Sequence, residues 1–497
     1  MPSSAPAAST GSKLNRSLRA RHLQMIAIGG AIGTGLFLAS GGTIAQAGPG
    51  GALVAYGVIG IMVLFVMQSL GELSTHLPVA GSFQTYASRY VSRSFGFATG
   101  WNYWFNWAIT LAAELVAGGV IMAYWLPDVP SWIWAAVFLV LLTGLNALSA
   151  RAFGEGEFWF AAIKVATVVV FLVLGVLMIA GVMAGPSPGL NNWTTGEAPF
   201  AGGWLSVVSV FMIAGFSFQG TELVGVAAGE SEDPRRNMPK AIRTIFWRIM
   251  LFYVLAIAVI GFLLPYTDPS LLTSAETGDV TASPFTLVFE RAGIGIAAGV
   301  LNAVILTAVL SAGNSGLYAS TRMLYSLAED GIAPRVFARL SSRGVPVPAL
   351  LATAAVGLFA FLTNVMGDGG AYTWLLNVSG LSGFMVWVGI SWSHFRFRRG
   401  WLRQGHSLAE LPYVAPLFPL GPVLALLTLL VVIAGQNYQA VLEGHLLEVV
   451  SAYIGLPIFA AVWLIHRLVA GRSGRMVALE EMDVRGISPH ELTDSAS

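Results

Sequence analysis

The sequence predicts an all-α integral membrane protein with twelve transmembrane helices. The 497 residues are 56% hydrophobic and only 10% charged, against roughly 25% charged in an average soluble domain. The 57 glycines and 15 tryptophans are typical of membrane bundles, in which small residues let helices approach and aromatic residues lie at the interfaces. This composition excludes a soluble enzyme and a disordered chain, and the absence of cysteine excludes a disulfide-stabilised secreted domain.

Runs of about 20 apolar residues, the length that crosses a bilayer, define the individual spans. A polar tail of residues 1–21 precedes the first span, and a second tail of residues 469–497 follows the last. In chain order the predicted spans are 23–47, 51–76, 96–125, 131–150, 158–183, 202–228, 243–265, 285–313, 348–364, 371–394, 416–436 and 447–468.

The basic residues orient these spans. Of the 26 lysines and arginines, all but Lys164 and Arg291 lie in the two tails or in and beside the loops that follow even-numbered spans. Cytoplasmic segments of membrane proteins carry this excess of positive charge. We therefore expect both termini to be cytoplasmic. The formal net charge of only +1 gives no indication of a nucleic-acid partner, because nucleic-acid-binding proteins carry an excess of basic residues. The apolar spans indicate that the chain lies in a lipid bilayer.

Two predicted spans are interrupted by residues that form helices poorly. The first contains Gly29-Gly30-Ala31-Ile32-Gly33-Thr34-Gly35, and the sixth contains Gly215-Phe216-Ser217-Phe218-Gln219-Gly220-Thr221-Glu222. Single glycines in such spans usually serve helix packing. Two clusters five spans apart instead favour an inverted repeat, in which broken helices present free backbone groups near the middle of the membrane. The repeats would be 22–183 and 201–396, with two further helices in 416–468.

Several motifs resemble those of the amino acid–polyamine–organocation superfamily, and within it those of bacterial amino acid permeases. They are Gly30-Ala31-Ile32-Gly33-Thr34-Gly35, Gly71-Glu72-Leu73, Gly100-Trp101-Asn102-Tyr103-Trp104, and Gly220-Thr221-Glu222 leading to Glu230-Ser231-Glu232-Asp233-Pro234. The similarity runs essentially end to end. It implies a secondary transporter of the bacterial inner membrane that imports a cationic amino acid, foremost L-lysine, together with protons by alternating access.

The charges of an amino acid must be met when it leaves water. The free N–H groups of Gly33, Thr34 and Gly35 suit its carboxylate. Unpaired carbonyls near Ile32 and at the sixth-span break suit its ammonium. The resemblance assigns the carboxylate to the same three residues. It also implies that an aromatic residue of the sixth span packs over the bound ligand. The expected contacts of that span are Phe216, Ser217 and Gln219.

One face of the third span carries Asn106, Thr110 and Glu114, which are spaced by four residues. Inserting an acid into a membrane helix costs roughly 2.5–3.5 kcal/mol, so Glu114 needs a role. It could pair the cationic side chain of the substrate or carry a proton. The alternative is a hydrogen bond to a neighbouring helix. Permeases for uncharged amino acids also carry an acid at this position, so Glu114 alone does not identify the substrate.

Glu222 follows the sixth-span break. There the resemblance implies an acid used in gating or in the response to protons, and Glu222 is also a candidate partner for the ammonium of the substrate side chain. The alternative is a structural hydrogen bond to the first span. The acids Glu230, Glu232 and Asp233 lie beyond it beside arginines, and we expect most of this run to form a solvated loop.

Lys164 lies within the fifth span with no acid within one turn. An ion pair with a carboxylate of another helix would explain it. The resemblance implies a different role: a lysine here takes the place of the sodium ion that joins spans 1, 5 and 8 in sodium-coupled relatives. A buried lysine releases its proton readily because burial removes its hydration. Its expected neighbours are Asn314, Ser315 and carbonyls of the first span.

The sequence contains no nucleotide-binding loop, no set of metal ligands and no catalytic triad. We therefore expect no enzymatic activity and no cofactor. Two alternatives to proton-coupled lysine import remain. One is an exchanger or a permease for another amino acid, such as arginine or an aromatic residue. The other is an amino acid sensor that acts through a membrane partner.

Overall fold

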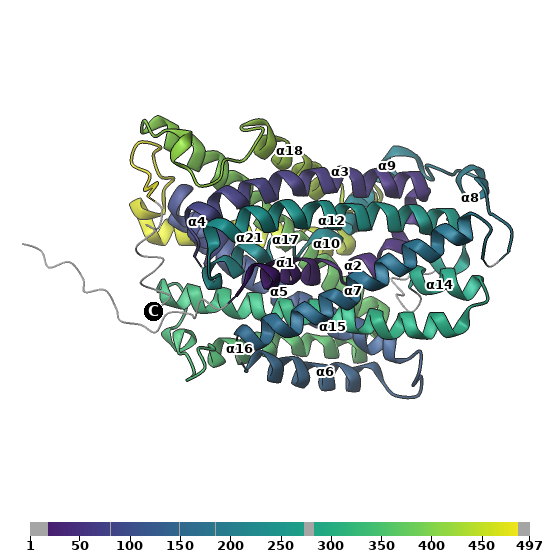
Figure 1. Ribbon diagram of the computed structural model, residues 1–497. Helices are drawn as coiled ribbons and strands as arrows, with labels where there is room; N and C mark the ends of the chain where they lie inside the picture. The colour runs from purple at the N-terminus through teal and green to yellow at the C-terminus, as the bar shows by residue number, and fades with distance from the viewer. Residues whose placement is uncertain (1–17, 80, 149, 184, 273–282, 486–497) are drawn as a thin grey trace, which may run out of the picture.

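The computed structural model describes residues 18–79, 81–148, 150–183, 185–272 and 283–485. Within these ranges the chain folds into an elongated bundle whose long helices run along one axis (Figure 1). The only bridge between extended segments in the described chain joins Leu18 to Ser231. Most of the two predicted tails, 1–17 and 486–497, lies outside the described residues.

The first predicted span is broken where the glycines predict it. Helix α1 (Ala20–Ala31) ends before Ile32 and Gly33, and the short helix α2 (Thr34–Phe37) follows. Helix α3 (Ser40–His76) continues the chain and contains a second interruption at Gly48, whose φ of 73° is open to glycine but strained for other residues. Pro49 follows and lacks a backbone donor. Two helices therefore meet inside α3.

The sixth predicted span is broken in the same manner. Helix α9 (Gly203–Ser209) leads into α10 (Phe211–Phe218), and α11 (Leu223–Ala227) and η1 (Ala228–Glu230) follow an irregular turn. The two breaks lie against each other. A methyl group added at Gly35 would lie 2.5 Å from Cα of Ser217, and one at Gly220 would lie 2.5 Å from the carbonyl carbon of Gly30. Glycine at both positions lets the two backbones touch.

Helix α5 (Arg93–Met122) lies at the centre of the bundle and packs most extensively against α15 (Gly295–Glu329) and α17 (Thr363–Arg403). Like α3, helix α17 contains a non-helical glycine, Gly367, at a φ of 73°. The remaining helices are α4 (Ser82–Tyr90), α6 (Ser131–Asn146), α7 (Ala150–Ile179), α8 (Asn191–Thr194), α12 (Pro234–Leu263), α14 (Pro284–Arg291), α16 (Val347–Val356), α18 (Leu420–Gly435), α19 (Tyr438–Glu443), α20 (Leu446–Tyr453) and α21 (Gly455–Ala470), with 3-10 turns at Arg335–Ala338, Gly357–Leu362, Leu408–Glu410 and Gly471–Gly474.

Six helical segments of the described chain are long and apolar enough to cross a membrane, and three shorter apolar helices accompany them. Apolar side chains such as Val140, Leu430 and Leu468 are exposed on the outside of the bundle. A surface of this kind is suited to lipid rather than to water.

Both described chain ends lie at the same end of the bundle, which we call the terminal end. The backbone of Leu18 bonds to Glu230 and Glu232. The segment 477–484 packs across the ends of α3, α4 and α17, with Met482 and Val484 buried. The part of the predicted C-terminal tail up to residue 485 is therefore held against the bundle.

Candidate functional site

A small pocket lies where the two breaks meet α5. Its volume of about 10 Å³ has room for roughly one water molecule. A larger ligand can therefore enter only if the surrounding helices move apart. The lining residues come from all three elements: Gly30, Ala31, Gly33, Thr34, Gly35, Trp107, Thr110, Glu114, Phe216 and Gln219.

The first break contributes the beginning of α2 to this pocket. Gly33 is its N-cap, and the carbonyls of Gly33 and Thr34 accept the bonds of Phe37 and Leu38. The preceding N–H groups have no acceptor within the helix, because the first turn of any helix leaves its donors free. Ile32 is buried beside them, and its N–H bonds to Ile28. The N–H groups of Thr34 and Gly35 therefore have no acceptor within α2.

Glu114 lies directly at the first break. Its side chain is 3% exposed, and its Oε1 accepts a hydrogen bond from Thr34 Oγ1 at 3.0 Å. Its Oε2 has no hydrogen-bond partner among the described residues. A buried carboxylate oxygen without a partner is costly. This oxygen is therefore available to a ligand or a proton.

The rest of the α5 face divides between the pocket and helix α17. Thr110 lines the pocket and lies 2.5 Å from Ser379 Oγ. Asn106, expected on the same lining, instead accepts a bond from Ser379 through its Oδ1 at 3.2 Å. Asn106 therefore anchors α5 to α17 through its side chain, whereas its neighbour Trp107 lines the pocket.

The sixth-span break is fixed by hydrogen bonds from other helices. Gln219 Nε2 donates to Gly380 O at 2.9 Å. The hydroxyl groups of Ser217 and Tyr56 lie 2.9 Å apart. The hydroxyl of Tyr253 of α12 lies 2.6 Å from Ser217 O and 2.8 Å from Ala31 O and shares its one proton between these carbonyls, so it joins the two breaks. The sequence offers no signal for this role, since Tyr253 is an ordinary aromatic residue within an apolar run.

Glu222 lies outside the residues that line the pocket. Its Oε2 accepts the N–H of Gly220 at 3.0 Å and the indole Nε1–H of Trp387 at 3.2 Å. These bonds hold the turn of the sixth span and join it to α17. The bond to the first span, weighed as an alternative, is not among them.

Lys164 is fully buried on α7 and donates a hydrogen bond from Nζ to the carbonyl of Gly29 on α1. The expected contact with the first span is therefore present. Asn314 of α15, expected beside Lys164, bonds instead to Glu157 and Asn146. Sequence reasoning missed Glu157. Its signal is the seven-residue spacing to Lys164, which puts both side chains on one face of α7.

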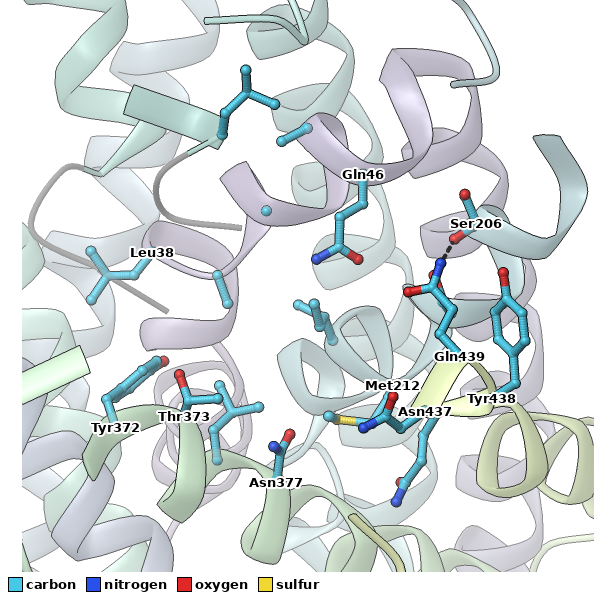
Figure 2. Close-up of a pocket in the computed structure, with 18 residues that line it drawn as sticks. Leu38, Gln46, Ser206, Met212, Tyr372, Thr373, Asn377, Asn437, Tyr438 and Gln439 are labelled. Atoms are coloured by element: carbon cyan, nitrogen blue, oxygen red, sulfur yellow. Dashed lines mark hydrogen bonds between the residues drawn. The ribbon is translucent and has the colours of Figure 1, made fainter. Parts of the chain in front are cut away.

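A much larger cavity of about 510 Å³ lies between the breaks and the end of the bundle away from the termini. Figure 2 shows its polar lining, with Gln46, Asn377 and Gln439 around the space and Tyr372 near its inner end. The described residues that line it carry no charge. Its inner wall includes Leu38, which directly follows α2, and Met212, which belongs to α10. The cavity therefore begins beside the small pocket.

Two buried ion pairs lie near the terminal end. Arg322 of α15 donates to Glu230 at 2.8 Å, and Tyr318 donates to the same oxygen. Glu230 is 1% exposed, so the expectation of a solvated loop is wrong at this position. Arg398 of α17 pairs with Glu72 of α3. A cavity of about 390 Å³ also lies at the terminal end, beside Arg93, Asp330 and His466. The larger hollow of the described bundle lies at the other end.

Comparison with known proteins identifies the family. The family model described as amino acid permease matches residues 22–478. The lysine-specific permease LysP of Escherichia coli K12 is 58% identical over 92% of this chain and 94% of its own length. LysP of Lactococcus lactis is 48% identical over 96% and 94%. The histidine permease HisP of the same organism is 48% identical over 95% and 98%. The chain belongs to the amino acid permease family.

Proposed function

We propose that this chain imports a cationic amino acid, foremost L-lysine, together with protons. The observation that carries the proposal is the meeting of two broken helices around a pocket that contains a buried acid, Glu114. The N–H groups that begin α2 suit the carboxylate of an amino acid, and we assign its ammonium to backbone carbonyls near the breaks. The acid suits a cationic side chain or a proton.

The relatives support lysine as the first substrate to test. The lysine-specific permease of Escherichia coli is 58% identical to this chain, a higher value than for the two permeases of Lactococcus lactis. However, the lysine permease and the histidine permease of Lactococcus lactis are both 48% identical to this chain. Overall similarity at that level does not separate substrates. The pocket must therefore be probed with a panel of amino acids.

Alternating access is part of the proposal. The larger cavity at one end and the buried ion pairs near the other support an outward-facing state, in which the substrate reaches the breaks through the larger cavity. The proposed architecture is twelve spans, with 22–183 and 201–396 as inverted repeats. The interruptions at Gly48 and Gly367 support this count, because each divides a long helical segment into two.

The proposed location is the bacterial inner membrane with both termini cytoplasmic. The common end of the described termini and the distribution of basic residues support it. Lys164 is proposed to take part in proton coupling, together with Glu114 or Glu222. The bond from Lys164 to Gly29 supports a link between coupling and the first break.

Uptake of radiolabelled L-lysine into vesicles that contain the purified protein tests this function. We expect accumulation driven by a pH gradient, inhibition by cationic amino acids in a competition panel, and no requirement for sodium. Exchange of lysine without net accumulation would instead identify an exchanger. Binding without any transport would identify a sensor.

A further inference from the structure

Glu157 is a fully buried acid at the junction of three helices. It lies on α7, and its carboxylate accepts hydrogen bonds from Ser311 Oγ and, at 3.4 Å, from Asn314 Nδ2 of α15. It also touches α1, because a methyl group added at Gly29 would collide with its Oε1. Helices α1, α7 and α15 pack side by side in pairs, as Figure 1 also shows.

Lys164 contacts the same residue of α1. Two turns after Glu157 on α7, it donates to the carbonyl of Gly29. It lies within electrostatic reach of both Glu157 and Glu114. Gly29 lies in the last turn of α1, just before the break at Ile32. The acid and the lysine therefore hold the end of α1 from two sides.

These three charged groups do not balance. One ammonium faces two carboxylates, so the cluster carries a net charge of −1 when all are ionised. All three side chains are buried. An uncompensated charge in a protein interior is costly. The cluster therefore favours the uptake of one proton, by Glu157 or by Glu114.

No other charged group among the described contacts of this junction supplies the missing compensation. Arg21 and His22 of α1 pair with Glu155 at the terminal end, and Arg322 of α15 pairs with Glu230. The other polar groups that face the cluster are neutral: Ser311 and Asn314 of α15, Asn146 of α6, Thr34 of α2, and Tyr253 of α12, whose hydroxyl bonds to Ala31.

We propose that Glu157 receives the transported proton, with Lys164 as its fixed counter-ion, an inference that rests on the proposed function. Proton uptake converts the carboxylate to a carboxylic acid, with no other bond made or broken, and weakens its attraction to Lys164. Because both residues contact Gly29, this change acts on α1 beside the substrate pocket. Protonation of one acid thereby changes how firmly the first break is held.

The test uses Glu157→Gln in vesicles whose membrane potential is clamped at zero. Glutamine keeps an acceptor for Ser311 but cannot titrate. We expect lysine counterflow to be retained, and lysine accumulation driven by a pH gradient and lysine-induced proton uptake to be lost. Full accumulation with the wild-type pH profile would overturn the inference. Loss of counterflow as well would assign Glu157 a structural role and would also overturn it.

Glu155→Gln is the matched control, because this half-buried acid lies on the same helix and pairs with Arg21 and His22 at the terminal end. We expect it to behave as the wild type in both assays. If the wild type itself shows no lysine uptake under a pH gradient, the proposed function fails and the inference fails with it. If the wild type accumulates lysine and Glu157→Gln does so equally, only the inference fails.

The pairing with Lys164 has its own readout. Lys164→Met leaves two buried acids without a cation, whereas the double variant Glu157→Gln/Lys164→Met removes one acid as well. We expect the melting temperature to fall in Lys164→Met and to recover in the double variant. A double variant that melts no higher than Lys164→Met would show that Glu157 is not the counter-ion.

Discussion

Thr34 donates its hydroxyl to Oε1 of Glu114 over 3.0 Å, and this bond joins the first break to the central helix α5. Thr34, which is expected to bind the carboxylate of the amino acid, thus contacts Glu114, which is expected to bind the side chain of the amino acid or a proton. The two roles are separated by one hydrogen bond. Substitutions on either side of this bond should therefore affect binding in different ways.

Gly35→Leu should abolish lysine binding. A methyl group at this position would lie 2.5 Å from Cα of Ser217, so a larger side chain forces the two breaks apart and disorders the donors of α2. Equilibrium binding of radiolabelled lysine to the purified variant measures the effect. The control is Gly57→Leu on α3, where nothing lies within 4 Å. Unchanged affinity in Gly35→Leu would remove this break from the site.

Glu114→Gln should weaken lysine binding by about 2–5 kcal/mol if Glu114 pairs the ε-ammonium, because the substrate charge loses a desolvated partner. Norleucine, which lacks that ammonium, should lose less. Competition binding with both ligands measures the difference, and the loop variant Asp128→Asn is the control. Equal losses for lysine and norleucine would assign Glu114 to structure or to proton transfer.

Tyr253→Phe should lower stability without changing the size of the side chain. The hydroxyl shares its one proton between Ala31 O and Ser217 O, and a hydrogen bond of this kind is worth about 0.5–1.5 kcal/mol. Both carbonyls would remain buried without this donor. We expect a lower melting temperature and slower lysine exchange. Tyr124→Phe, at an exposed position after α5, should leave both unchanged. A variant with wild-type exchange would show that the bridge between the breaks is not needed.

The backbone of the candidate site could be predicted from the sequence, because its signal is local. Clusters of glycine around Gly33 and Gly220 interrupt otherwise apolar runs, and the helices end there. The four-residue spacing of Thr110 and Glu114 likewise gives their common face. The spacing does not reveal which residues of that face bond to another helix, and Asn106 bonds to Ser379 of α17.

The buried ion pairs could not be predicted in the same way, because their partners are distant in the chain. Glu230 has polar sequence neighbours that indicate a solvated loop, yet Arg322 meets it from 92 residues away. The partner of Glu157 on α15, Ser311, is 154 residues distant. No local pattern encodes such contacts. The C-terminal segment is a similar case, since its polar composition hides Met482 and Val484.

The last prediction concerns this C-terminal segment, which is tied to α4 by Asp483 and Arg89 at 2.5 Å and to α3 by a bond between His76 and Val484. The Arg485 guanidinium, and then that of Arg89, hold the pKa of Asp483 well below its ordinary value. A lowered pKa in the folded protein means that the ion pair stabilises at pH values above the ordinary value of about 3.9. This contribution is lost as the pH falls through the folded value.

Hydrogen exchange of residues 477–485, corrected for the intrinsic rate at each pH, measures the attachment. In the wild type we expect these residues to be protected from exchange at pH 7 and less protected in strong acid. In Asp483→Asn we expect lower protection already at pH 7, with no further dependence on pH. Asp483 is 38% exposed, so the loss should be on the order of 0.2–1 kcal/mol and should shrink with added salt. The control is Glu480→Gln, whose pair with Arg403 is far more exposed and should contribute little. Equal protection in Asp483→Asn and the wild type would mean that the apolar contacts of Met482 and Val484 hold the segment by themselves.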